Sequence, residues 1–254
     1  MKLTGYKFGF SFVVSFCLTV NVLTFAICPL LAQNNIEPNP IRVGEVLTFG
    51  VKVRGIPAGS QMMRVDGETT LDGQSVYHLT SAARTNRIFS LFYKFEDERE
   101  SYVTTQQFQP LRYVKNIVDR KYRVNIHIDF DMDSGKVKLS KNQKKLPELE
   151  APVGIQDELS MLYLFRMKEL KVGEIYTFPA LIGTKVVEIR VEIVKREKSK
   201  TVLGNLDTIV LRSSHGYMVW ITDDERRIPV RIEANTKVGK LVGTLKKVDY
   251  NAKE

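Results

Sequence analysis

Residues 42–49 read RVGEVLTF, and residues 171–178 read KVGEIYTF, so five of the eight positions are identical. In each copy a Gly-Glu pair, which suits a turn, leads into residues that alternate between apolar and polar. Each copy is also followed by a similar order of hairpin signals. We therefore predict one β-rich domain, 42–250, built from two related halves, 42–140 and 171–250. The octapeptide can also recur by chance, because turn and strand chemistry select few residue types.

Most of the remaining chain also has the pattern of β-strands. Residues 122–130 alternate most cleanly, with large apolar side chains at every second position. Asp72-Gly73 is the strongest hairpin signal. Pro110 and Pro229 lead corresponding segments of the two halves, where proline indicates a sheet margin or the start of a strand. We expect a mainly β fold of curled antiparallel sheets, arranged as a partly open barrel or as two arcs.

Residues 157–170 predict one helix between the two halves. Asp157 and Glu158 stand where the N-terminal helix dipole favours negative charge, and Gly173 follows the expected end. Apolar side chains occupy almost every side of this segment. We therefore expect the helix to be buried against the curved sheet and to join the halves.

The first 32 residues have the features of a secretory signal peptide. Lys2 and Lys7 precede a long uncharged, largely apolar run over 8–32, which is followed by polar residues. We expect this segment to be cleaved, residues 33–41 to form a linker, and the protein to be exported to the periplasm or cell envelope. Retention as an N-terminal membrane anchor is the alternative, because the run is long enough to span a bilayer.

Both cysteines, Cys17 and Cys28, lie in this N-terminal segment. A chain cleaved after it has no thiol, which excludes disulfides, thiolate zinc sites and cysteine nucleophiles from the mature protein.

The chain is basic, with a formal net charge of +9. In an exported protein this charge favours contact with an anionic membrane surface over nucleic acid, although a solvated basic surface explains it more simply. The aromatic run at 88–95, preceded by Arg84 and Arg87, suits either a lip that touches lipid or closes over a ligand, or an ordinary core segment. We expect core packing, because large apolar side chains are most often buried.

The acidic motif around residue 131 is a poor match to a calcium loop. Asp129, Asp131 and Asp133 precede Gly135, but the glycine falls one place late for an EF-hand and Ser140 stands where the bidentate Glu belongs. Alternating acids on a strand that ends in a turn explain the same residues, so we predict no metal site.

The chemistry-bearing residues form no enzyme motif. His78, His127 and His215 are each isolated from a second ligand, and no phosphate loop, HExxH or dinucleotide fingerprint is present. The acid pairs Asp97-Glu98 and Asp223-Asp224 suit glycoside hydrolysis only if two carboxyl groups face each other across a cleft. Arginines beside both pairs indicate surface or turn acids instead. We therefore predict no catalytic residues and no cofactor.

Five short motifs resemble the bacterial DUF3108 family: WITDD at 220–224, RIPV at 227–230, VGEVL at 43–47, GIPAG at 55–59 and QDELS at 156–160. The resemblance extends over the whole mature chain. It implies an exported, mostly β protein of the Gram-negative envelope, and it carries no established activity. The motif positions, to which no role is assigned, are Gly44, Glu45, Gly55, Gly59, Asp157, Trp220, Asp223, Asp224 and Pro229.

From these observations we expect an exported, non-enzymatic envelope protein that binds a lipid or another amphipathic molecule in or on its curved sheet. A structural or protein-interaction module with an envelope protein partner is the alternative, and a hydrolase is the third possibility. The interior discriminates between them. A carrier needs a lined pocket on the order of several hundred Å³, whereas packing by Phe95, Tyr122, Ile126 and Leu162 would leave it solid.

Overall fold

The computed structural model describes residues 39–236 and 239–250. The chain divides into two units, Met1–Ile36 and Glu37–Glu254, and every described residue lies in the second. The predicted signal peptide, 1–32, and the first part of the predicted linker lie outside the described residues. Within the two described ranges, no helix is long and apolar enough to cross a membrane.

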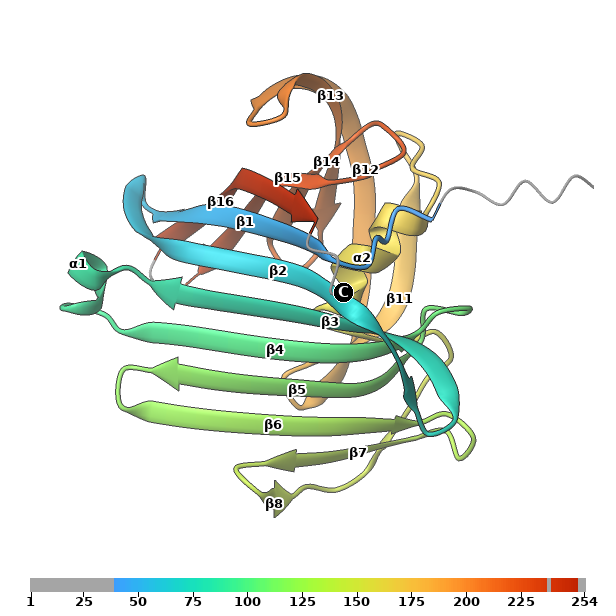
Figure 1. The fold of residues 1–254 in the computed structure, drawn as a ribbon. Helices are drawn as coiled ribbons and strands as arrows, with labels where there is room; N and C mark the ends of the chain where they lie inside the picture. The colour runs from blue at the N-terminus through green and yellow to red at the C-terminus, as the bar shows by residue number, and fades with distance from the viewer. Residues whose placement is uncertain (1–38, 237–238, 251–254) are drawn as a thin grey trace, which may run out of the picture. The chain divides into compact units, whose positions relative to one another are not determined.

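A single sheet of 16 strands makes up the fold (Figure 1). Its first arm contains β1 (Glu45–Val53), β2 (Ile56–Leu71), β3 (Gln74–Thr85), β4 (Phe95–Thr104), β5 (Pro110–Asp119), β6 (Tyr122–Asp131), β7 (Lys136–Lys141) and β8 (Lys144–Lys145). Its second arm contains β11 (Ile175–Ile182), β12 (Lys185–Thr201), β13 (Gly204–Ser213), β14 (Tyr217–Thr222), β15 (Pro229–Thr236) and β16 (Gly239–Tyr250). The short strands β9 (Leu149–Glu150) and β10 (Gln156–Asp157) and the helix α2 (Ser160–Met167) connect the arms.

Each arm is an antiparallel meander, and the two arms meet where β1 pairs with both β2 and β16. The sheet ends at β8 on one side and at β10 on the other, and β10 pairs with β11 in parallel. The sheet is therefore not closed. This arrangement confirms the predicted mainly β fold of curled antiparallel strands in a partly open barrel.

The helix α2 fills the space between the arms. Tyr163 packs in a core cluster with Leu47 and other buried residues of the first arm, whereas Phe165 packs in a second cluster with Ile189 and other residues of the second arm. Residues two apart lie about 200° apart around a helix, so these side chains point in opposite directions. Burial on both faces explains why this segment has an almost completely apolar sequence.

The helix is shorter than the predicted 157–170. Asp157 belongs to β10, and its carboxylate accepts hydrogen bonds from the backbone N–H groups of Leu159 and Ser160, both at 2.8 Å. The acid signal therefore marks a turn before the helix, because a short Asp side chain readily bonds the backbone two or three residues on. The helix stops before Lys168, whose backbone is extended.

The aromatic run at 88–95 is not the core segment that we expected. Asn86 accepts a hydrogen bond from the Phe89 N–H and begins the short helix α1 (Arg87–Ser90), which lies beyond the ends of β3 and β4 (Figure 1). Ile88 is 75% exposed, Leu91 79% and Phe92 85%. The turn carries these side chains past the end of the sheet, where no other part of the described chain covers them.

The two copies of the octapeptide form the same turn. Gly44 and Gly173 have φ values of 83° and 92°, which a glycine adopts without strain. Their N–H groups donate to the carbonyl oxygens of Val65 and Ile193, each at 2.8 Å. The strand that follows then pairs with the next one, β1 with β2 and β11 with β12.

The fifth strands of both arms also start alike. Pro110 begins β5 and Pro229 begins β15, and a β-bulge lies beside each. Thr104 and Thr222 close the preceding loops: the backbone N–H of each donates to the residue before the proline, and its hydroxyl oxygen accepts that residue's N–H, at 2.9–3.0 Å. The internal duplication itself stays a prediction, which superposition of 42–140 on 171–250 tests.

Candidate functional site

The motif residues do not converge on one site. Gly59 lies where β2 meets β3 so closely that a Cβ atom would stand 2.1 Å from the Arg84 carbonyl oxygen. Gly55 occupies the turn between β1 and β2, and Gly44 the turn before β1. Trp220, on β14, donates from Nε1 to Glu197 at 2.6 Å. These residues maintain the local geometry of the sheet.

The acids of the WITDD motif are held by neighbouring arginines. Asp223 accepts from Arg196 at 2.6 Å and from Arg227 at 3.1 Å. Asp224 accepts from both Nε and Nη2 of Arg226, at 3.1 and 2.6 Å. Burial of Asp224 opposes ionisation, but its hydrogen bonds from Arg226 and neighbouring groups lower its pKa overall. Both carboxylates therefore act as anchors of the loop between β14 and β15.

Glu45 forms a buried ion pair that the sequence did not reveal. Both oxygens of its carboxylate accept from Arg166 on α2, at 2.5 and 2.8 Å, and each side chain is 1% exposed. The same guanidinium donates to the carbonyl oxygens of Pro40 and Arg226, at 3.0 and 3.2 Å. Burial opposes ionisation of Arg166, but the hydrogen bonds that it donates to Glu45, together with the negative charge of that carboxylate, outweigh burial and raise the pKa of Arg166. The only signal was one charged residue inside an apolar helix.

Asp157 is completely buried where the connecting segment crosses the first arm. Besides its two backbone partners, its carboxylate accepts from the Ser101 hydroxyl on β4 at 2.6 Å. Burial raises the pKa of Asp157 to about 6, against the hydrogen bonds from Ser101, Ser160 and Leu159, which lower it. The side chain thus ties the start of α2 to the inner face of the sheet.

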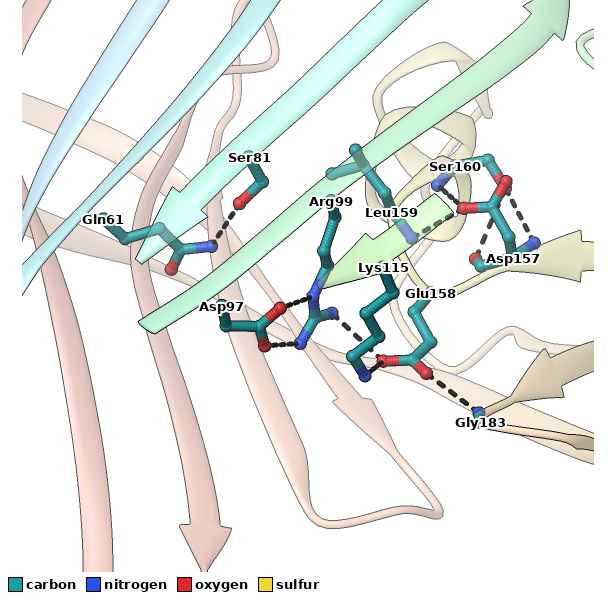
Figure 2. Close-up of polar contacts among 10 residues, drawn as sticks. All are labelled: Gln61, Ser81, Asp97, Arg99, Lys115, Asp157, Glu158, Leu159, Ser160 and Gly183. Atoms are coloured by element: carbon teal, nitrogen blue, oxygen red, sulfur yellow. Dashed lines mark hydrogen bonds and ion pairs between the residues drawn. The ribbon is translucent and has the colours of Figure 1, made fainter. Parts of the chain in front are cut away.

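Glu158 extends this contact into a network of charges (Figure 2). Figure 2 shows Arg99 and Lys115 pointing toward it from β4 and β5; the ion-pair distances are 3.1 and 2.7 Å. Its other oxygen accepts from the Gly183 N–H, in the turn between β11 and β12, at 2.9 Å. Asp97 accepts from Arg99 at 3.0 and 2.6 Å. The network joins the two arms and leaves each of these charges paired.

The predicted acid pair Asp97-Glu98 therefore does not face a cleft. Asp97 points inward to Arg99, whereas Glu98, the next residue of the strand, is exposed. Of the histidines, His78 contacts Glu100 at 3.1 Å and stacks on Tyr102. In the described part of the chain, no group of three His, Cys, Asp or Glu side chains is placed to hold a metal ion.

We predict that Asp157 makes stability depend on pH in one direction. Because its folded pKa of about 6 lies above the usual 3.8, the folded protein retains a proton that the unfolded chain releases. This contribution is fully present below the unfolded pKa and is lost as pH rises toward 6 and above. The free energy of unfolding of Asp157→Asn, relative to the wild type, should rise by roughly 2–3 kcal/mol between pH 4 and 7.

Urea unfolding of both proteins at several pH values measures this difference. Asn can keep both backbone contacts through its oxygen and can donate to Ser101 through its amide, so the variant isolates the charge. A difference that stays constant from pH 4 to 7 would contradict the prediction.

A cavity of about 250 Å³ lies at the end of α2. Its lining residues are mostly charged and of both signs: Pro40, Arg166, Met167, Lys168, Glu169, Asp224, Glu225 and Arg227. This composition does not suit the apolar part of a lipid, because ligand pockets of that kind have mainly hydrophobic walls.

Exposed apolar side chains gather at one end of the first arm, and we call this group the apolar tip: Ile56, Ile88, Leu91, Phe92 and Tyr122. The β1–β2 turn, the β3–β4 connection that contains α1, and the β5–β6 turn all lie at this end of the first arm (Figure 1). Asn86, at the start of α1, bonds the carbonyl oxygens of Pro57 and Ala58 beside the β1–β2 turn, at 3.0 and 2.8 Å. Arg120, in the β5–β6 turn, donates its N–H to the Lys94 carbonyl oxygen at 2.8 Å and lies over the Tyr93 ring.

Comparison with known proteins yields one family and a shared fold. A family model described as "Protein of unknown function (DUF3108)" matches residues 47–246. The crystal structure of a β-barrel-like protein of DUF1849 from Brucella abortus is similar, with a TM-score of 0.59, 12% identity, and coverage of 84% of this chain and 100% of that chain. A protein of YmcC-like fold from Bacteroides fragilis matches with a TM-score of 0.33, 12% identity, and coverage of 83% and 97%. No curated protein matches the chain in sequence.

Proposed function

The chain belongs to the DUF3108 family of proteins of unknown function, and from that premise we propose that it is an exported, non-enzymatic envelope protein that binds a lipid surface through its apolar tip. The observation that carries this proposal is the exposure of the tip. Ile88, on the short helix α1, and Leu91 and Phe92, in the turn that follows it, are each at least 75% exposed at the end of the strands. Burying a large apolar side chain is worth about 1.5–3 kcal/mol, so insertion of all three side chains into a bilayer is strongly favoured.

The side-chain packing inside the curved sheet favours a lipid-binding site on the surface of the sheet rather than in its interior. Ile126 is 5% exposed, and Leu162 of α2 packs against the same core cluster. Tyr122 is 77% exposed at the rim and Phe95 is half-buried there. The cavity at the end of α2 is lined by charged side chains, which suits water better than an acyl chain.

The buried charges support a non-enzymatic role. Glu45 pairs with Arg166, and Glu158 pairs with Arg99 and Lys115, so these groups already have partners within the protein. A general acid or base needs a free position within hydrogen-bond reach of a substrate proton. These groups instead connect strands and α2, which is the behaviour of structural ion pairs.

A polarity-sensitive dye attached at the tip tests the proposal. The dye is placed at Leu91→Cys, in a chain that carries Cys17→Ala and Cys28→Ala so that no other thiol is present. We expect a blue shift of its emission when lipid vesicles are added, because the side chain enters an apolar medium. This signal reports on the tip whether or not the N-terminal segment is retained.

The matched control carries the dye at Val202→Cys, which is 54% exposed in the turn between β12 and β13. We expect no shift there. Equal shifts at both positions would mean non-specific adsorption. No shift at Leu91 on any vesicle would overturn the proposal and favour the alternative, in which the tip docks on an envelope protein.

A further inference from the structure

Exposed cations lie at, and a few residues behind, the end of the strands that carries the apolar tip. We call them the basic rim: Arg87, Arg120, Lys121, Lys141, Lys144 and Lys145. The β7–β8 turn is brought to this end because Asn142 donates its N–H to the Asn125 carbonyl oxygen, and Asn125 donates its N–H to the Asn142 side chain, both at 2.8 Å. The turn therefore lies beside Asn125, three residues after the start of β6 at Tyr122, and it is set back from the β5–β6 turn (Figure 1).

Among the described residues, none of the six members of the basic rim forms an ion pair with an acidic side chain. By contrast, Lys94, at the same end, pairs with Glu96 at 3.1 Å, and Lys138, nearer the other end of β7, pairs with Asp131 at 3.0 Å. Strand β7 shows the contrast within a few residues, since its lysine at 138 has an acid partner and its last lysine, 141, has none.

The spread of these charges favours an extended partner. Strands β4, β5, β6 and β7 separate α1 from the β7–β8 turn, and neighbouring strands are about 4.8 Å apart, so the basic rim extends over about 20 Å. Charges this far apart cannot converge on one small anion. A broad charged surface can meet several of them at once, while the apolar side chains of the tip enter it.

We propose that the basic rim binds the phosphate headgroups of an anionic lipid bilayer and so directs the apolar tip into that surface. The inference rests on the proposed function and adds the charge of the partner and the orientation of the first arm on it. Each lysine or arginine near an anionic membrane strengthens binding about fivefold. Six cations beside an apolar tip thus select anionic over neutral lipid.

The test compares vesicles of phosphatidylcholine alone with vesicles that contain about 30% phosphatidylglycerol, a composition with a clearly negative surface potential. Binding is followed with the dye at Leu91→Cys. We expect tighter binding to the anionic vesicles, and weaker binding to them as salt is raised, because the Debye length shortens. Adding Lys144→Gln and Lys145→Gln should weaken binding to anionic vesicles about 30-fold.

The control with the same net charge carries Lys198→Gln and Lys200→Gln, which are exposed on β12 in the second arm. It should change binding less than about threefold, because screening limits the reach of charges far from the surface. Thermal unfolding of both lysine variants checks that they are folded. The salt dependence is measured on the dye-labelled Leu91→Cys protein with all its lysines intact, so it does not depend on the folding of either lysine variant.

Two results would overturn the inference, and they are distinguishable. Equal binding to neutral and anionic vesicles, with no effect of salt, sinks the role of the basic rim and leaves the tip as a lipid anchor. Absence of a dye shift on every vesicle sinks the proposed function and this inference together. A similar loss in the Lys144/Lys145 and Lys198/Lys200 variants shows that net charge alone acts, and also rejects the basic rim.

Discussion

Arg166→Ala is expected to lower the free energy of unfolding by about 3–5 kcal/mol, the range for removing one partner of a buried ion pair. The loss is large because Glu45 would remain 1% exposed with no cation beside it. The carbonyl oxygens of Pro40 and Arg226 would also lose a donor. Urea denaturation measures the change, and Glu45→Ala should have an effect of the same order.

The double variant Glu45→Leu with Arg166→Met shows whether stability depends on the charges of this pair or on the packing between the two side chains. Apolar residues of similar volume often replace a buried pair without loss, so this variant should recover most of the stability. Arg212→Ala is the control, because its pair with Glu192 is exposed and should be worth less than about 1 kcal/mol. A loss below that value for Arg166→Ala would mean that water reaches Glu45 through the adjacent cavity, and the prediction would be wrong.

Phe165→Ala is expected to cost about 3–5 kcal/mol, as for other fully packed aromatic side chains. Phe165 is 5% exposed, and its ring centre lies 5.7 Å from those of both Tyr176 and Phe178 on β11. Removing the ring leaves a cavity between α2 and the second arm, and it removes contacts that hold the two together. Urea denaturation again gives the value, and amide hydrogen exchange in β11 and β12 should rise first.

Phe92→Ala provides the matched comparison. It deletes the same ring at a position that is 85% exposed, and its effect on stability should stay within about 0.5 kcal/mol. The same substitution removes part of the apolar tip, so it should weaken vesicle binding while the protein stays fully folded. Similar losses of stability from Phe165→Ala and Phe92→Ala would show that α2 does not hold the second arm.

Local patterns were sufficient for the strands and for the class of fold. The alternation at 122–130 predicted β6, whose Ile126, Ile128 and Phe130 are buried on one face. The Gly-Glu pairs predicted turns, and both form. Such features depend on neighbours along the chain, through backbone conformation and the two-residue period of a strand, so a sequence shows them directly.

Burial and charge pairing that depend on contacts between distant segments could not be predicted from local patterns. The aromatic run at 88–95 has the composition of a core segment, yet Asn86 turns it past the end of the sheet, where Ile88, Leu91 and Phe92 are exposed. Glu158 is far in the sequence from Asp97, Arg99 and Lys115, which lie on β4 and β5. They meet only because the connecting segment crosses the inner face of the first arm.

Glu45 and Glu174 show the division most directly, since they hold the same place in the two octapeptides. The sequence by itself determined that each follows a glycine turn and lies at the entry to a strand. Only the tertiary structure decided that Glu45 is buried in a pair with Arg166, whereas Glu174 is half-buried and accepts a hydrogen bond from Tyr176 at 3.0 Å. Turn geometry is set by a few adjacent residues, but burial and charge pairing depend on segments that the chain brings together from a distance.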